Sequence, residues 1–388
     1  MGAWLTVPLG LGLTLASPPS LRTGAPLETA PVPASTPDAL PTRAARATTL
    51  YVNFDGAVLR DDCGNDARYN CSTLGYLFEN YVGPFTAGAS YRAAILDAVR
   101  SDLAELGVAV TGVRPPPEID YTMVLYGDLG EQGFAGVAPY IDCADQKSYD
   151  TSFARGYTSP NTGSTVILQE AAHTWGLEHV NRREDLLHPI AEGFAPSFLD
   201  ECSKIVSNTD FDESPGVCNR MHTLFCDAGW QNGFRELRHL FGPAQPDVDR
   251  PIVELLSPVL DARYEYPSVV EIRTHIEDAR HPQWYEVSFE LDGELIFSDA
   301  LWGDFELAFV VPGPGRYELT MRVADEAGNA SELPVRFDVL EAGALDASLP
   351  SGCSLRGADT PSPETWLGSV GLLLLFRRRR RRPGARRS

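Results

Sequence analysis

The sequence predicts an α+β domain followed by an all-β sandwich. The chain has 388 residues, and domains of about 100–200 residues make two or three domains the expected number. Six of the seven cysteines lie before residue 227. Helix and strand patterns are mixed up to residue 245, whereas the chain beyond Pro246 shows strand patterns. We therefore expect a first domain at 47–245 and a second domain at 249–341.

The first domain should contain a mixed sheet and two helices. Apolar residues alternate in the segment 50–54, as in a strand, and strands are also expected at Val108–Val113 and Tyr121–Tyr126. Helical spacing covers Tyr91–Leu106. A second helix is expected to begin near Ser164, after a loop rich in serine, proline and glycine, with Ser or Thr as its N-cap.

The second domain reads as a succession of strands. Val269–Ile276, Glu286–Phe297 and Tyr317–Val323 are β-rich, and the Asp-Gly pair at 292–293 is a strong hairpin signal. About ninety residues with several strands predict an immunoglobulin-like sandwich. The run 315–329 also resembles bacterial Ig-like and cadherin-like modules of secreted proteins. We assign this domain a spacer or adhesive role.

Composition and charge exclude several classes of protein. Apolar residues make up 43% and charged residues 22% of the chain, which disfavours a disordered or fibrous protein. Acidic residues outnumber basic residues 53 to 32, and eight of the basic residues lie between Arg377 and Arg387. A body this acidic repels phosphate backbones, so we expect no nucleic-acid partner.

The cysteines indicate an oxidising compartment. Six clustered cysteines without a CxxC pair predict three disulfides, and the short separation of Cys63 from Cys71 suggests one local loop. Fifteen connectivities are formally possible. The alternative is six reduced, buried thiols. The clustered cysteines are Cys63, Cys71, Cys143, Cys202, Cys218 and Cys226, and Cys353 stands alone near the C-terminus.

The N-terminal segment predicts secretion. Residues 4–16 are apolar and too short to span a bilayer comfortably, which is typical of a signal peptide at 1–17, although no Lys or Arg precedes them. Residues 18–46 are rich in Pro and Ala without a hydrophobic period, so we interpret them as a linker.

The C-terminal segment 342–388 has three parts in order: Cys353, an apolar run at 366–376 and an arginine cluster at 377–382. The apolar run covers about half of a hydrocarbon core of about 30 Å. The order resembles bacterial tripartite sorting tails, most closely the MYXO-CTERM class. That resemblance implies transient membrane association through the tail, a sorting protease acting near Cys353, and retention at the outer surface of a bacterial cell. A weak tail anchor is the alternative.

One motif could carry chemistry. Residues 169–179 read QEAAHTWGLEH. Positions 169 and 173 project from one helix face, and a glycine at 176 allows the turn that brings His179 back toward them. The segment resembles the pattern HExxHxxGxxH of metzincin zinc metalloproteases, with a departure at Gln169. The resemblance implies an active-site helix, Zn²⁺ held by Gln169, His173 and His179, and Glu170 as the catalytic base.

Two departures from the metzincin pattern bear on activity. Metzincins place a methionine in a turn beneath the metal, and here Leu187 occupies that place. An amide oxygen such as that of Gln169 is a weaker zinc donor than imidazole, so zinc affinity should fall first. His188 is a conceivable substitute ligand. Either the domain is a non-catalytic relative, or it holds a weakened metal.

The sequence therefore predicts a secreted, surface-sorted zinc metalloendopeptidase-like protein that hydrolyses peptide bonds in protein or peptide substrates. A non-catalytic surface binding or adhesion protein is the alternative, favoured by Gln169. Other ionisable residues lack the spacing of metal ligands. The remaining histidines are expected to lie on the surface or to be packed, and the acidic residues near 210 are expected to form a solvated loop. These are His222, His239, His275 and His281, and Asp210, Asp212 and Glu213.

Overall fold

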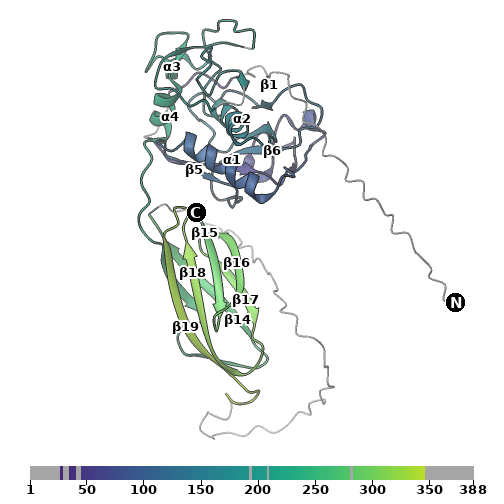
Figure 1. Cartoon of the computed structure of the whole chain (residues 1–388), viewed down its shortest axis with the longest axis vertical. Coiled ribbons are helices and arrows are strands. Elements are labelled where there is room, and N and C mark those ends of the chain that lie inside the picture. The colour runs from purple at the N-terminus through teal and green to yellow at the C-terminus, as the bar shows by residue number, and fades with distance from the viewer. Residues whose placement is uncertain are drawn as a thin grey trace, which may run out of the picture.

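The computed structural model describes residues 27–28, 35–40, 45–191, 195–207, 209–279 and 283–345. The predicted signal peptide, most of the linker that follows it and nearly all of the sorting tail lie outside these residues. Within the described part of the chain, no helix is long and apolar enough to cross a membrane. The described residues form one body that carries the helices and a second body built of strands (Figure 1).

The first domain is built on a five-stranded mixed sheet. Its strand order is β5-β2-β6-β8-β7. The first four strands are parallel, and the short edge strand β7 pairs antiparallel with β8. All six residues of β6 are buried, which is typical of a parallel strand covered on both faces. The bounds are β2 Thr48–Asn53, β5 Val108–Thr111, β6 Thr122–Gly127, β7 Gly136–Val137 and β8 Thr151–Arg155.

Two helices of this domain pack against each other and the sheet. Helix α1 spans Ala89–Asp102 and buries Ile95 and Val99. Helix α2 spans Pro160–His173, and its residues from Thr162 onward are buried. It begins four residues before the predicted start at Ser164. Ser159 caps it by accepting a hydrogen bond from the Thr162 N–H, and Pro160 fits the first turn, where no N–H is needed.

Shorter elements complete the first domain. The short helices are η1 Ala67–Tyr69, η2 Gly75–Phe78, α3 Asn219–His222 and α4 Gly233–Phe241. Three short antiparallel strand pairs are β1 Leu27–Glu28 and β9 Ile190–Ala191, β3 Ala57–Val58 and β4 Tyr81–Val82, and β10 Ser203–Lys204 and β11 Trp230–Gln231. Three disulfides cross-link the domain, as predicted. They join Cys63 to Cys71, Cys143 to Cys218, and Cys202 to Cys226.

The second domain is a sandwich of a three-stranded and a five-stranded sheet, with orders β12-β14-β17 and β13-β19-β18-β15-β16. Residues in β14 alternate between buried and exposed, because one face of the sheet meets the core. The predicted hairpin is present, with Asp292 and Gly293 at φ 51° and 82°. The strands are β12 Ile252–Ser257, β13 Ala262–Glu265, β14 Val269–Glu277, β15 Trp284–Leu291, β16 Glu294–Trp302, β17 Glu306–Val310, β18 Gly315–Ala324 and β19 Ala330–Leu340.

Candidate functional site

The motif predicted from the sequence lies at the C-terminal end of α2 and in the turn after it. Gly176 has φ +97°, and a Cβ added there would lie 3.0 Å from the carbonyl oxygen of Asp142, so both the backbone angle and the space favour glycine. This turn returns the chain so that His179 faces His173. The motif residues are almost completely buried, with exposed fractions of 0% for Gln169, 1% for Glu170, 2% for His173 and 1% for His179.

His173 and His179 meet through their Nε2 atoms, which lie 3.1 Å apart. The Nδ1 of His173 lies 2.9 Å from the carbonyl oxygen of Leu177. A carbonyl only accepts hydrogen bonds, so this Nδ1 carries the proton and the Nε2 of His173 presents a lone pair to His179. Burial lowers the pKa of His173, and it lowers that of His179 strongly, with His173 and His188 adding to the effect. Burial therefore favours the neutral form of both rings.

Gln169 is tied to the loop that follows the motif. Its Nε2 donates to the carbonyl oxygen of Leu186 at 2.9 Å and also to that of His188. Because both partners are acceptors, the orientation of the amide is determined. Its Oε1 is buried without a hydrogen-bond partner among the described residues. The amide nitrogen of Gln169 thus holds the backbone on both sides of Leu187.

Glu170 is packed between α2 and the edge strand β7. A Cβ added at Gly136 of β7 would lie 2.5 Å from the Oε1 of Glu170, so the carboxyl group fills the space that a side chain would take. That oxygen is buried and has no hydrogen-bond partner in the described part of the chain. Burial raises the pKa of Glu170 well above its usual range. Burial therefore favours the protonated form of this carboxyl group.

His188 contacts groups other than the His173–His179 pair. Its Nδ1 is 3.1 Å from the carbonyl oxygen of Ile190, and its ring centroid is 5.2 Å from that of Phe211. Together with Thr165 and Asp185 it lines a pocket of about 10 Å³. That volume holds about one water molecule. The motif residues 169, 170, 173 and 179 do not line this pocket.

The positions and number of possible donor atoms show whether the motif residues fit a zinc ion. Two nitrogens at about 2.05 Å from a tetrahedral zinc lie about 3.3 Å apart, close to the 3.1 Å between His173 and His179. A catalytic zinc needs three protein ligands. Among the described residues, no third His, Cys, Asp or Glu brings a ligand atom within 4.8 Å of both histidines. His188 does not do so either. The residues present do not fit a catalytic zinc set, because only the amide of Gln169 stands at the third position.

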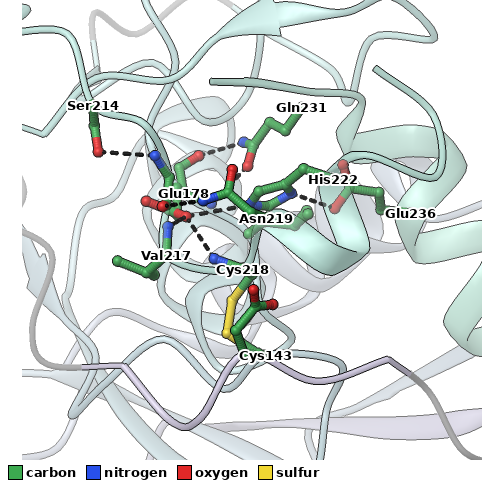
Figure 2. A network of polar contacts seen from close by, with 12 residues as sticks. Cys143, Glu178, Ser214, Val217, Cys218, Asn219, His222, Gln231 and Glu236 are labelled. Carbon is green, nitrogen blue, oxygen red and sulfur yellow. Dashed lines mark hydrogen bonds and ion pairs between the residues drawn. A yellow bond between two sulfur atoms is a disulfide. The ribbon is translucent and has the colours of Figure 1, made fainter. Parts of the chain in front are cut away.

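A buried charged network includes Glu178 of the motif and was not predicted from the sequence (Figure 2). The Nδ1 of His222 lies 2.8 Å from Glu236 Oε2, and its Nε2 lies 3.2 Å from Glu178 Oε1. Both ring nitrogens face carboxylates, so both donate. Burial alone lowers the pKa of His222, but the two carboxylates outweigh it and raise the pKa to about 9. His222 is therefore an imidazolium at neutral pH.

Backbone groups complete this network. Glu178 Oε1 accepts hydrogen bonds from the N–H groups of Val217 at 2.6 Å and Cys218 at 3.3 Å, and Gln231 bonds to both backbone groups of Glu178 (Figure 2). Ligand atoms of Glu178, Cys218 and His222 lie within 4.8 Å of one another. The sulfur of Cys218 is bonded to Cys143, however, so this cluster is an ion-paired support for the turn before His179 rather than a metal site.

The remaining predicted residues are not gathered at the motif. His222 is packed, as described above, His239 and His275 are exposed, and His281 lies outside the described residues. Asp210, Asp212 and Glu213 are exposed, and Glu213 forms an ion pair with Lys204.

Comparison with known proteins adds information on the fold. No family model and no curated protein matches the chain. Among solved structures, it is similar to fibronectin(III)-like modules of Clostridium thermocellum CbhA, with 21% identity over 23% of this chain and 96% of that chain and a TM-score of 0.21. It is also similar to the PKD1 domain of Vibrio anguillarum Epp, with 14% identity over 25% of this chain and 99% of that chain and a TM-score of 0.18. Both are Ig-like β-sandwich modules, and the matches extend no further than that fold.

Proposed function

We propose that this chain is a non-catalytic, metzincin-like protein of a bacterial cell surface, which binds or adheres through its two domains. The observation that carries the proposal is the hydrogen bonding of the Gln169 side chain. Its amide nitrogen is used in two hydrogen bonds to the backbone of Leu186 and His188. The residue at the first ligand position of the motif thus has a structural role.

The burial of the site supports the same proposal. Peptide hydrolysis requires a substrate carbonyl and a water molecule to reach the metal and the general base. The four motif residues are at most 2% exposed. Burial raises the pKa of Glu170 well above its usual range, which disfavours the ionised carboxylate that a general base requires. The arrangement is that of a packed core.

The second candidate, a zinc metalloendopeptidase, is favoured by one observation. The bond from His173 Nδ1 to Leu177 selects the tautomer whose Nε2 lone pair can bind a metal, and His179 Nε2 lies 3.1 Å away. In this alternative His173, His179 and Gln169 hold a weakly bound zinc ion and Glu170 is the base.

The proposed surface location rests on the predicted signal peptide and sorting tail, and the three disulfides suit an oxidising compartment.

The deciding experiment compares the unmodified protein with Gln169→His and with Gln169→His/Glu170→Ala. Each is dialysed against zinc, its bound metal is measured, and its cleavage of an unfolded protein substrate is followed. We expect no cleavage by any of the three, and more tightly bound zinc in Gln169→His because an imidazole replaces an amide.

A His239→Gln variant is the matched control, because that imidazole is exposed and lies outside the motif. Zinc-dependent cleavage by the unmodified protein would establish the metallopeptidase and overturn the proposal. Cleavage that appears only in Gln169→His would show that the cleft opens readily and that loss of the ligand alone removed activity.

A further inference from the structure

A short N-terminal segment, residues 35–40, lies against the surface of the first domain. Its backbone forms a parallel β-bridge to the loop after β7, where the N–H of Thr36 donates to the carbonyl oxygen of Ile141 at 2.9 Å. Residues 35, 37, 38 and 40 are exposed. A separate contact further upstream is the pairing of β1 with β9. The segment is thus added to the surface of the domain, in the manner of a bound peptide, and is not part of its core.

The side chain and backbone of this segment meet specific partners in the loop after β7. The hydroxyl oxygen of Thr36 accepts hydrogen bonds from the backbone N–H of Cys143 at 2.9 Å and from Gln146 Nε2 at 3.3 Å. The same Nε2 donates to the carbonyl oxygen of Pro37 at 3.1 Å. Cys143 is 0% exposed with the segment in place, so a residue without a side-chain oxygen at position 36 would leave its N–H unpaired.

The next acidic side chain contacts a different element of the domain. The two carboxylate oxygens of Asp38 lie 3.1 Å and 3.3 Å from the backbone nitrogen of Arg220 in α3, whose N–H they accept. Pro37, between the two recognised side chains, has a fixed φ, which lowers the entropy that the segment loses on binding. The contacts therefore match a hydroxyl residue, a proline and an acidic residue in that order.

The surface under the segment is held in place by other groups. The Cys143–Cys218 disulfide joins the loop after β7 to the start of α3, with the two Cα atoms 5.3 Å apart (Figure 2). The same loop is fixed to α2, because the N–H of Asp142 donates to the carbonyl oxygen of His173 at 3.0 Å. The two halves of the surface thus keep their spacing without the segment, and a preorganised surface binds an extended ligand at a low entropic cost.

We propose that this surface binds extended peptides in which a hydroxyl residue is followed, two positions later, by an acidic residue, and that residues 36–38 occupy it as an internal ligand. A tether gives such a ligand an effective concentration of about millimolar, so weak contacts keep it bound and exclude a free peptide. Release of the segment opens the surface to a segment of the same pattern from another protein chain. This rests on the proposed binding function, whose own test is made at the motif, so each can fail separately.

The test uses the full mature chain and a fluorescent peptide of residues 33–42. In Thr36→Val/Asp38→Ala the internal ligand is weakened, because both side chains that accept hydrogen bonds from the domain are lost. Fluorescence anisotropy should show the peptide binding this variant about tenfold or more tightly than the unmodified protein. Ser35→Ala is the matched control, since Ser35 is exposed and forms its bridge through the backbone, so it should exclude the peptide.

Hydrogen exchange gives a second readout. The N–H groups of Cys143 and Arg220 donate to the segment, so residues 141–146 and 219–222 should exchange about tenfold faster in the double variant. Addition of the peptide should restore protection, whereas a peptide that carries the same two substitutions should not. If the double variant fails to fold, Thr36→Val alone decides the question.

Three results would contradict the proposal. Absence of peptide binding to the folded variant would overturn the surface. Equal binding to the variant and to the unmodified protein would overturn its occupation by residues 36–38. Equal binding of the native and the substituted peptide would overturn the recognition of the hydroxyl and acidic side chains.

Discussion

The two domains bury apolar side chains in the same way but treat polar groups differently. The sandwich core is a continuous apolar cluster around residues such as Tyr285, Phe289 and Phe337. The first domain also has an apolar core, but it buries the carboxyl groups of Glu170 and Glu236 as well. All three disulfides of the described residues lie in the first domain. The second domain also buries the carboxyl group of Asp325, but the first domain buries more ionisable groups and carries the cross-links, so it depends more on specific partners.

The reason is the cost of removing ionisable groups from water. A buried charge must be paired, or the group must shift its pKa and become neutral. The first domain uses both routes. His222 is charged between two carboxylates, whereas burial raises the pKa of Asp150 to about 7, so that the neutral form is populated near neutral pH. Disulfides then offset part of the cost by restricting the unfolded chain.

Removal of the long-range disulfide should have the largest effect on this contrast. The Cys143–Cys218 bond closes a separation of 75 residues, so Cys143→Ala/Cys218→Ala should lower the free energy of unfolding of the first domain by about 4 kcal/mol. Hydrogen exchange followed by mass spectrometry resolves the two domains.

The pair Cys63→Ala/Cys71→Ala is the matched control. It closes a separation of 8 residues and should cost about 2.5 kcal/mol, while the sandwich should be unchanged in both variants. Equal losses in the two double variants would show that loop entropy does not govern the stability of the first domain.

Alkaline pH should destabilise the first domain selectively. The pKa of His222 rises on folding from 6.5 to about 9, so its contribution to stability is complete below about pH 6.5 and is lost as the pH rises through about 9. Between pH 7.5 and 9.5 the first domain should lose about 2 kcal/mol of unfolding free energy. Urea denaturation at each pH measures the change.

Substitution of His222 by Gln should flatten this pH dependence, because the titrating group is removed. His275→Gln is the control, since His275 lies exposed on the sandwich and should leave the first domain unaffected. A slope that persists in His222→Gln would assign the effect to other groups and weaken the ion-paired description of the network.

Apolar core substitutions should have the smallest effect and should not distinguish the domains. Ile95 in α1 is 0% exposed and Ile272 in β14 is 2% exposed. Replacement of either by Val should cost its own domain about 1 kcal/mol, because one buried methylene group is removed. Denaturation of the two single variants tests this. A cost several times larger in one domain would show that the cores differ in packing as well as in polarity.

Much of the fold could be predicted from local sequence signals. The Asp-Gly pair at 292–293 predicted a hairpin that is present, and the β-rich composition of 269–276 predicted a strand that is also present. The motif was correctly expected at the end of a helix followed by a glycine turn, because Gly176 adopts a positive φ that other residues rarely take. Six clustered cysteines predicted three disulfides, although only the local loop of Cys63 and Cys71 could be suggested in advance.

The sequence by itself determined the order of the elements, their periodicity and the types of side chain at the motif, because these depend on neighbours a few residues apart. Only the tertiary structure decided which partners those side chains meet. Gln169 bonds to backbone 17 and 19 residues away, and His222 joins a glutamate 44 residues before it. Such contacts depend on how the chain folds back on itself, and no local pattern records them. The same motif letters could therefore line an open zinc site or, as in this protein, a packed core.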